Sequence, residues 1–249
     1  MPRPPLLLLP PSEAKADGGR PVGRPDAFAD ELAGPRAGVL AELERVLRSR
    51  RPAVQDRVLG VRGELLTRAL AATDALVAGT APVLPAWKRY TGVVWAALEP
   101  ATLSPGARRR VLVPSGLYGL TTAADPVADH RLKLMVSLGR LGRLSTFWRP
   151  EVTAALARRT AGRTVVDLLP AEHAHAVDLA ALARVGRVVR VRFVAADGAR
   201  AVGHGAKSAK GRLARVLLDD GLDGVGGFVF DGWRAEVDGD VVTVTAPSR

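Results

Sequence analysis

The chain has 249 residues, 47% of them hydrophobic and 24% charged, which is typical of a soluble globular protein with a substantial core. Its formal net charge of +11 favours anionic partners such as nucleic acid or nucleotides. Cysteine is absent, which excludes disulfides, thiolate catalysis and cysteine-ligated metals and fits a reducing compartment. No apolar run is long enough for a signal peptide or a membrane span, so we expect a cytoplasmic protein without a membrane partner.

The N-terminal third predicts one short strand followed by helices. Residues 6–9 are four leucines ended by two prolines, which is typical of a short buried strand. Residues 26–50 carry apolar side chains at helical spacing, and 54–59 and 64–77 predict a further pair of helices. We interpret residues 26–80 as a helical insertion.

The rest of the chain predicts a mixture of strands and helices. Residues 87–98 fit either a strand or a helix, and Ser104 with the following proline predicts the start of a short helix. Further on we expect, in order, strand 111–113, strand 164–169, helix 171–182, strand 188–196, helix 206–218 and a hairpin-like pair within 226–246. This alternation predicts a single mixed α/β domain, residues 1–249, around a mixed sheet.

A glycine-containing turn, Gly60-Val61-Arg62-Gly63, separates the two helices predicted for residues 54–77. Its pattern matches the hairpin of a helix-hairpin-helix element, in which glycines allow close approach and helix N-terminal N–H groups hold a DNA phosphate. Such contacts read no base sequence. Gly60, Arg62 and Gly63 are therefore candidate DNA-binding residues. The alternative is an ordinary turn between two helices with glycine at a C-cap.

The segment Pro114-Ser115-Gly116-Leu117-Tyr118-Gly119 directly follows a predicted buried strand. This places backbone donors and the Ser115 hydroxyl at a sheet edge, where α/β proteins commonly bind ligands. The segment has neither the ending of a P-loop nor the GxSxG pattern of a nucleophile elbow. Tyr118, like Tyr90, lies in a glycine-containing turn, and either ring fits equally well at the rim of the core.

Lysine is rare beside arginine: only five of the 36 basic residues are lysine. They are Lys15, Lys88, Lys133, Lys207 and Lys210. Where lysine stands instead of the much commoner arginine, the position is a candidate for a function that needs a compact ammonium group. The alternative is that these five lysines reflect codon usage alone. Lys207 and Lys210 share one helical face, and cations at a helix N-terminus favour a bound anion there; the alternative is a solvated basic face. Lys133 lies in an apolar, strand-like run and need not belong to the same site.

Metal and cofactor chemistry have little support in the sequence. The candidate ligands are Glu172, His173, His175 and Asp178, which His130 and His204 could join. Two histidines two positions apart on a helix point about 200° away from each other, which makes a poor chelate. We therefore predict neither a metal nor a cofactor.

Taken together, the motifs resemble the YaaA (UPF0246) family of peroxide stress proteins along nearly the whole chain. The matching motifs are Ser12-x-x-Lys15, Tyr90-x-Gly92-x-Val94-Trp95, Ser115-Gly-Leu-Tyr-Gly119, Asp125-Pro126 before Arg131-Leu132, Phe147-Trp148, Asp167-Leu168 with Glu172, and Lys207-x-x-Lys210-Gly211-x-x-x-Arg215. The chain departs from the pattern at Glu13, where the family's SPAK-like start has proline, and in middle loops that look shortened.

The resemblance implies a single mixed α/β fold with a helix-hairpin-helix insertion and a basic cleft. It also implies binding of duplex DNA and a role in limiting DNA damage by peroxide and unincorporated iron, and it names no catalytic residue. We expect largely non-specific, salt-dependent binding through the turn at residues 60–64, Ser115 and a cleft. The cations expected to build that cleft are Lys15, Lys88, Arg131, Lys207, Lys210 and Arg215.

Two other functions stay open. The chain could be an enzyme that acts on a nucleobase, a nucleotide or damaged DNA through a cleft lysine as base or Schiff-base nucleophile. The candidates for that chemistry are Lys15, Lys207 and Lys210, with Tyr118, Asp167 or Glu172 in acid–base support. Its ligand would then be a nucleotide or another anionic small molecule. The third hypothesis is an iron-binding protein that uses histidines and carboxylates.

Overall fold

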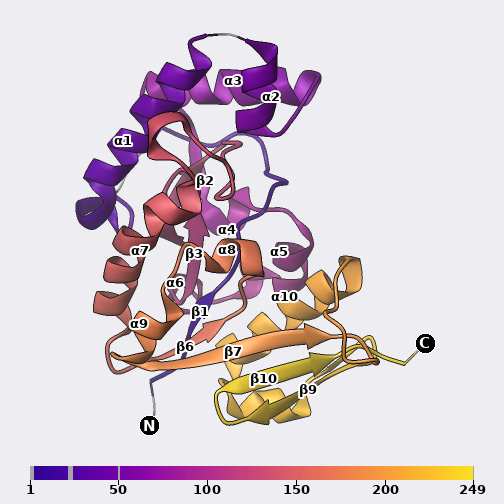
Figure 1. Cartoon of the computed structure of the whole chain (residues 1–249). Helices are drawn as coiled ribbons and strands as arrows, with labels where there is room; N and C mark the ends of the chain where they lie inside the picture. The colour runs from indigo at the N-terminus through magenta and orange to yellow at the C-terminus, as the bar shows by residue number, and fades with distance from the viewer. Residues whose placement is uncertain (1–2, 22–24, 50, 249) are drawn as a thin grey trace.

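The apolar runs predicted as strands pair into one eight-stranded sheet in the computed structural model (Figure 1). The structure describes residues 3–21, 25–49 and 51–248. In spatial order the strands are β4 (Gly119–Thr122), β3 (Val111–Ser115), β1 (Leu6–Leu8), β6 (Thr164–Asp167), β7 (Arg187–Val194), β10 (Val241–Thr245), β9 (Trp233–Asp238) and β8 (Val229–Phe230). A second, two-stranded sheet pairs β2 (Val83–Pro85) with β5 (Pro126–Ala128). The predicted mixed α/β class is therefore confirmed.

The middle of the large sheet is parallel. Strands β3, β1, β6, β7 and β10 are paired in parallel, while β4 pairs antiparallel with β3 at one edge and β9 pairs antiparallel with both β10 and β8 at the other. Leu7 of β1 pairs with Val111 of β3 on one side and with Val166 of β6 on the other. Strand β3 lies on one side of β1 and the later strand β6 on the other, so the order of the strands reverses at β1. Such a switch point commonly forms a ligand-binding crevice at the carboxyl ends of the strands.

Helices cover both faces of the sheet (Figure 1). They are α1 (Ala29–Leu47), α2 (Pro52–Leu59), α3 (Glu64–Val77), α4 (Ala86–Arg89), α5 (Val93–Leu98), α6 (Pro105–Arg109), α7 (Leu144–Thr160), α8 (Ala171–Ala174), α9 (Leu179–Ala183) and α10 (His204–Asp219). Short 3₁₀ turns η1 (Pro100–Thr102), η2 (Gly139–Leu141) and η3 (Asp223–Gly227) complete the description. Among the described residues, no helix has the length and apolar character needed to cross a membrane.

Most of the predicted elements are confirmed. The helical spacing after residue 26 corresponds to α1 (Ala29–Leu47), which contains Pro35, and most of the ambiguous stretch 87–98 is helical, in α4 and α5. Ser104 caps α6, because its Oγ accepts the N–H of Ala107 at 3.1 Å. The notable failures lie in two segments near the carboxyl ends of the strands.

The predicted helix 171–182 is wrong as a single element, because it breaks into α8 and α9. Asp178 starts the second helix by accepting the N–H of Ala181 at 3.0 Å. The strand-like run 131–138 is an irregular loop. Its leucines are buried, but its backbone crosses Gly116 so closely that a Cβ there would lie 2.5 Å from the Leu132 carbonyl oxygen.

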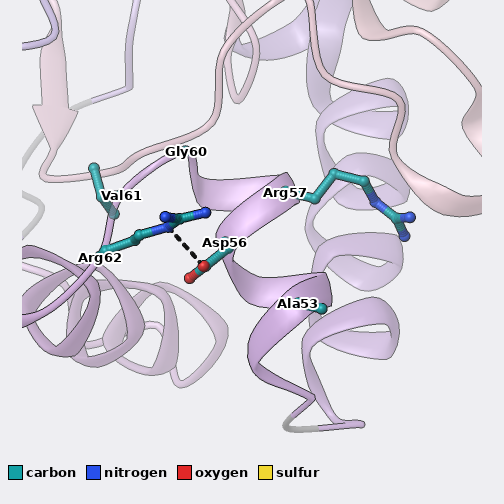
Figure 2. Close-up of a pocket in the computed structure, with 6 residues that line it drawn as sticks. All are labelled: Ala53, Asp56, Arg57, Gly60, Val61 and Arg62. Carbon is teal, nitrogen blue, oxygen red and sulfur yellow. Dashed lines mark hydrogen bonds and ion pairs between the residues drawn. The ribbon is translucent and has the colours of Figure 1, made fainter.

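Residues 60–63 connect α2 and α3 in a tight turn (Figure 2). Gly60 ends α2 with a φ of +65°, and its N–H donates to the carbonyl of Asp56 at 2.8 Å. Gly63 precedes α3 with a φ of +56°, a conformation that residues with a Cβ rarely adopt. Arg62 reaches back to the Asp56 carboxylate at 2.9 Å (Figure 2). This local geometry is common to a helix-hairpin-helix and to an ordinary turn between helices.

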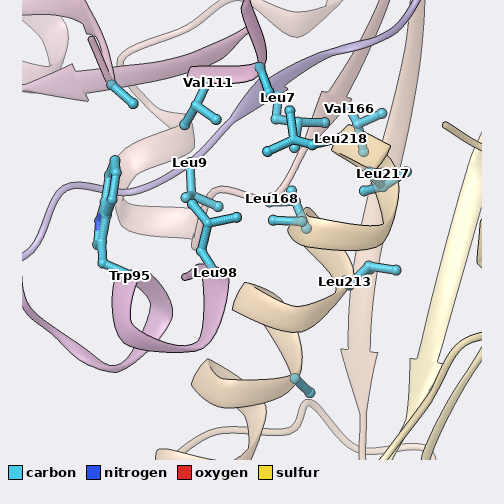
Figure 3. Close-up of a cluster of buried hydrophobic side chains, with 14 of the residues drawn as sticks. Leu7, Leu9, Trp95, Leu98, Val111, Val166, Leu168, Leu213, Leu217 and Leu218 are labelled. Atoms are coloured by element: carbon cyan, nitrogen blue, oxygen red, sulfur yellow. The ribbon is translucent and has the colours of Figure 1, made fainter. Parts of the chain in front are cut away.

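The alternation of side chains along β1 divides the core into two layers. Leu7 and Leu9 pack on one face of the sheet with α5 and α10 (Figure 3), whereas Leu6 and Leu8 pack on the other face with α1 and α7. All four leucines are at most 1% exposed. A strand that is buried on both faces must be apolar throughout, which explains why this segment has no polar alternation.

Helices α5 and α10 approach closely because Gly211 has no side chain. A Cβ at Gly211 would lie 2.3 Å from the carbonyl oxygen of Val94 and 2.7 Å from the Cβ of Ala97. Both of those atoms belong to α5, so the helix backbone itself would have to move. The glycine therefore fixes the distance between α10 and the sheet-bound helix α5.

We expect Gly211→Ala to lower the free energy of unfolding by about 1–3 kcal/mol, because the added methyl overpacks a closed interface. Gly38→Ala is a matched control, since Gly38 lies in α1 and a methyl group added there would have no atom within 4 Å. Alanine there should raise the free energy of unfolding by up to about 1 kcal/mol through helix propensity. Urea unfolding followed by circular dichroism measures both changes, and equal effects of the two substitutions would contradict the packing argument.

Candidate anion-binding cleft

A cleft of about 1370 Å³ opens at the carboxyl ends of the parallel strands, which we call the strand-end cleft. Residues 10–15, directly after β1, line it together with Ser115 and Gly116 at the end of β3. Asp167 at the end of β6 and the second half of β7 complete this wall. The cleft therefore lies where the switch point at β1 predicts a ligand site.

The lining of the strand-end cleft contains more cations than carboxylates. Its eight lysines and arginines are Lys15, Arg131, Lys133, Arg190, Arg192, Arg200, Lys207 and Lys210. Its three carboxylates are Glu13, Asp167 and Glu172. A concave surface dominated by one sign of charge concentrates the opposite sign, so the lining suits an anion.

The segment after β1 holds Lys15 at the cleft wall. The buried Ser12 accepts the N–H of Gly92 at 2.8 Å, and a Cβ on Gly92 would lie 2.4 Å from that hydroxyl oxygen. The ammonium of Lys15 donates to the carbonyl of Ser12 at 2.8 Å and lies 5.7 Å from the centre of the Tyr90 ring. Burial, reinforced by the Arg131 guanidinium, lowers the pKa of Lys15 to about 8.

Helix α10 supplies the opposite group of cations. Lys207 and Lys210 both line the cleft, as their spacing predicts, while Arg212 points elsewhere and pairs with Glu99 at 2.9 Å. The Lys210 ammonium lies 5.4 Å from the centre of the Phe193 ring. Burial lowers the pKa of Lys210 to about 8, and Asp167 opposes that shift.

Asp167 is the buried carboxylate of the cleft. Burial raises the pKa of Asp167, although its Oδ1 accepts the N–H of Leu169 at 3.0 Å and Lys210 and Arg190 favour its charged form. Glu172, by contrast, has a side chain that is 55% exposed. The two carboxylates proposed for acid–base support therefore share the cleft but differ in environment.

Tyr118 packs against the buried His130, which is one of the residues that line the cleft. The Tyr118 hydroxyl accepts the N–H of Ala128 at 3.0 Å, and burial raises the pKa of this tyrosine. Its ring lies edge-on to His130, with the centroids 5.5 Å apart. Burial lowers the pKa of His130 to about 3, so the imidazole is neutral. Tyr118 is not among the lining residues, whereas Ser115 is, and the Ser115 hydroxyl accepts the N–H of Tyr118 at 3.0 Å.

Lys133 lines the cleft as well, although its place in an apolar, strand-like run did not require it to belong to the same site. Its ammonium pairs with the Glu13 carboxylate at 2.8 Å. Its side chain also passes Gly60, where a Cβ would lie 3.6 Å from the Lys133 Cε. Since Leu59 and Val61 line the same wall, the turn at residues 60–63 lies beside the strand-end cleft.

Lys88 and Arg215 were expected in this cleft, and the structure corrects both. The Lys88 ammonium lies 5.0 Å from the centre of the Trp87 ring. Arg215 pairs with Asp219 on its own helix at 2.5 Å. Neither is among the lining residues. In Lys207-x-x-Lys210-Gly211-x-x-x-Arg215, helical geometry places the arginine about 140° around the helix from Lys210 and about 80° from Lys207.

Sequence reasoning missed Glu13, Arg190, Arg192 and Arg200 as cleft residues. Arg190 and Arg192 are two positions apart on β7, so they share one face of the strand, and both line the cleft. Arg200 lies between β7 and α10, in a segment without a local motif. In the described part of the chain, no three histidine or carboxylate side chains gather as metal ligands would.

The structure is that of a mixed α/β protein with a cleft at its strand ends, whose charged lining consists of eight lysines and arginines and three carboxylates. The family model described as "Peroxide stress protein YaaA" matches residues 6–236, and the chain belongs to this family. It is 34% identical over 226 residues to a UPF0246 protein of Streptomyces coelicolor, a match that covers 87% of this chain and 84% of the relative. A UPF0246 protein of Corynebacterium efficiens is 34% identical over 224 residues, covering 85% and 84%. The family assignment made from the motifs is thus confirmed.

The lowered pKa of Lys210 predicts a pH-dependent stability. The unfolded chain keeps this proton up to the ordinary pKa of 10.5, whereas the folded protein loses it near 8. Between these values the unfolded state binds more protons, so the contribution of Lys210 to the free energy of unfolding rises with pH. Lys210→Met should remove this rise, and so should Lys210→Arg, whose guanidinium does not titrate here.

Urea unfolding of the wild type and the two variants between about pH 7.5 and 10 measures this difference. The arginine variant keeps the positive charge, so it separates the loss of titration from the loss of charge. Curves that run parallel for all three proteins would show that the Lys210 amine is not desolvated.

Proposed function

We propose that this member of the peroxide stress family binds duplex DNA largely without regard to sequence. The observation that carries the proposal is the charge of the strand-end cleft, which is lined by eight lysines and arginines and only three carboxylates. Cations that neutralise backbone phosphates release counterions, and this release drives non-specific binding. A protein that covers DNA in this way suits a family of the peroxide stress response.

The position of the turn at residues 60–63 supports the same proposal. Its two glycines keep the backbone unobstructed, and the first N–H groups of α3 form an anion-suited helix terminus. Val61 and Lys133 join this turn to the strand-end cleft. In our proposal one phosphate lies at the turn while others lie along the cleft, and Arg62, whose side chain is 85% exposed, remains within reach of the backbone.

The proposal predicts that Lys207→Ala/Lys210→Ala weakens binding to a duplex oligonucleotide. The slope of log K against log salt should become shallower by about 0.9 for each phosphate contact that is lost. Arg212→Ala/Arg215→Ala is the matched control, because it removes two cations from the same helix, both engaged in ion pairs away from the cleft.

Fluorescence anisotropy across a salt series measures both affinity and slope. The control pair should leave the slope near that of the wild type. Absence of binding at low salt, or an equal loss in the two double variants, would refute binding through the strand-end cleft.

A second candidate function is an enzyme that uses a cleft lysine, and the lowered pKa values of Lys15 and Lys210 favour it. An amine with a pKa near 8 is about one-tenth neutral at pH 7, whereas an ordinary lysine is less than about one-thousandth neutral. Only the neutral amine attacks a carbonyl carbon. Lys210 lies in the cleft with Asp167, a carboxyl group whose pKa is raised and which could move a proton.

This enzyme hypothesis predicts a covalent adduct with an aldehyde such as the open sugar of an abasic site. The lysine amine would add to the carbonyl and lose water, and borohydride would reduce the resulting imine to a stable amine. Lys15→Ala or Lys210→Ala should abolish the adduct, whereas Lys88→Ala, outside the cleft, should not. Denaturing electrophoresis after borohydride treatment reads the result, and wild-type protein without an adduct would remove this candidate.

A further inference from the structure

Glu13 places a negative charge beside three cations of the strand-end cleft, which are Lys15, Arg131 and Lys133. Its Oε1 lies 2.8 Å from the ammonium of Lys133, and its main-chain carbonyl accepts a hydrogen bond from Arg131 at 2.6 Å. The hydrogen bond from Lys133 lowers the pKa of Glu13, and Lys15 and Arg131 act in the same direction. The carboxylate is thus ionised where the lining otherwise suits a ligand's anion.

Lys133, the ion-pair partner of Glu13, lies between two structural elements. Lys133 comes from the irregular loop after β5, passes Gly60 of the turn and reaches the segment after β1. Its side chain is 45% exposed and that of Glu13 is 73% exposed. Exposed ion pairs of this kind contribute little to stability, so an incoming anion can exchange with the carboxylate at small cost.

We propose that Glu13 is an internal competitor for anions, which holds Lys133 in the free protein and releases it when a ligand phosphate binds. The inference rests on the proposed anion-binding function of the cleft and assigns a specificity role to one residue within it. A single small anion would gain little from replacing the carboxylate. A polyanion that also contacts the other cleft cations gains their attraction as well, so the contact favours polyanions over simple anions.

The test is a double-mutant cycle on Glu13 and Lys133. Glu13→Gln keeps the size and removes the charge, and it should tighten polyanion binding about two- to fivefold. The salt slope should steepen by up to about 0.9, because Lys133 becomes free to contact one more phosphate. Lys133→Met should weaken binding, and in that background Glu13→Gln should have little remaining effect.

Glu172→Gln is the matched control, since it removes a charge from another exposed carboxylate of the same cleft. The change in polyanion affinity that it causes measures the effect of removing one negative charge from the cleft, and this change should be the same in the wild-type and Lys133→Met backgrounds. If Glu13→Gln and Glu172→Gln behave alike in both backgrounds, Glu13 is not a competitor for Lys133. Circular dichroism checks that every variant is folded.

Two probes separate this inference from the proposed function: a duplex oligonucleotide and inorganic tripolyphosphate. If the effects of Glu13→Gln and Lys133→Met on binding are non-additive with both probes, the role of Glu13 as a competitor is supported. Coupling with tripolyphosphate and no duplex binding by any variant supports the competitor and overturns duplex DNA as the ligand. Duplex binding without coupling overturns the competitor alone, and no binding of either probe by any variant overturns both.

Discussion

The burial of β1 on both faces is the constraint on which the rest of the structure depends. Its three leucines and the following Leu9 divide between the two layers of the core, so α5 and α10 can pack on one face and α1 and α7 on the other. Because β1 lies between β3 and β6, the chain immediately after it emerges at the switch point of the sheet. Two prolines end the strand there, and the next residues carry Ser12, Glu13 and Lys15 into the strand-end cleft. The core therefore determines where the polar residues lie.

The cleft combines cations in two different environments. Lys15 and Lys210 are partly buried, and the loss of hydration lowers the pKa of each amine. Lys133 and Lys207 remain exposed and act as solvated charges. The same lining therefore combines solvated charges, which attract anions over a distance, with deeper amines whose pKa is lowered. Glu13 pairs with the exposed Lys133, while Asp167, at the end of β6, interacts electrostatically with the partly buried Lys210.

Much of the fold could be predicted because the relevant signals are local. The apolar run at β1, the helical spacing of α1 and α3 and the glycines of the turn at residues 60–63 each depend on neighbours within a few positions. The two predictions that failed, for residues 171–182 and 131–138, depend on contacts that appear only in the folded chain. Asp178 caps a second helix where a continuous one was expected, and the loop at residues 131–138 buries its leucines without joining a sheet. The cleft residues at 15, 131, 207 and 210 were found because they belong to recognisable motifs.

The sequence by itself determined the class of fold, the family and the excess of positive charge. Composition, periodicity and short motifs can be read without knowing which distant residues are in contact. Only the tertiary structure decided which cations share a site. It brought Lys133 beside Glu13 and the turn at Gly60, although these residues are far apart in the chain. It also directed Lys88 onto Trp87 and Arg215 onto Asp219, away from the cleft. Long side chains meet according to the crossing of strands, loops and helices, and that geometry is set by the packing of the whole core.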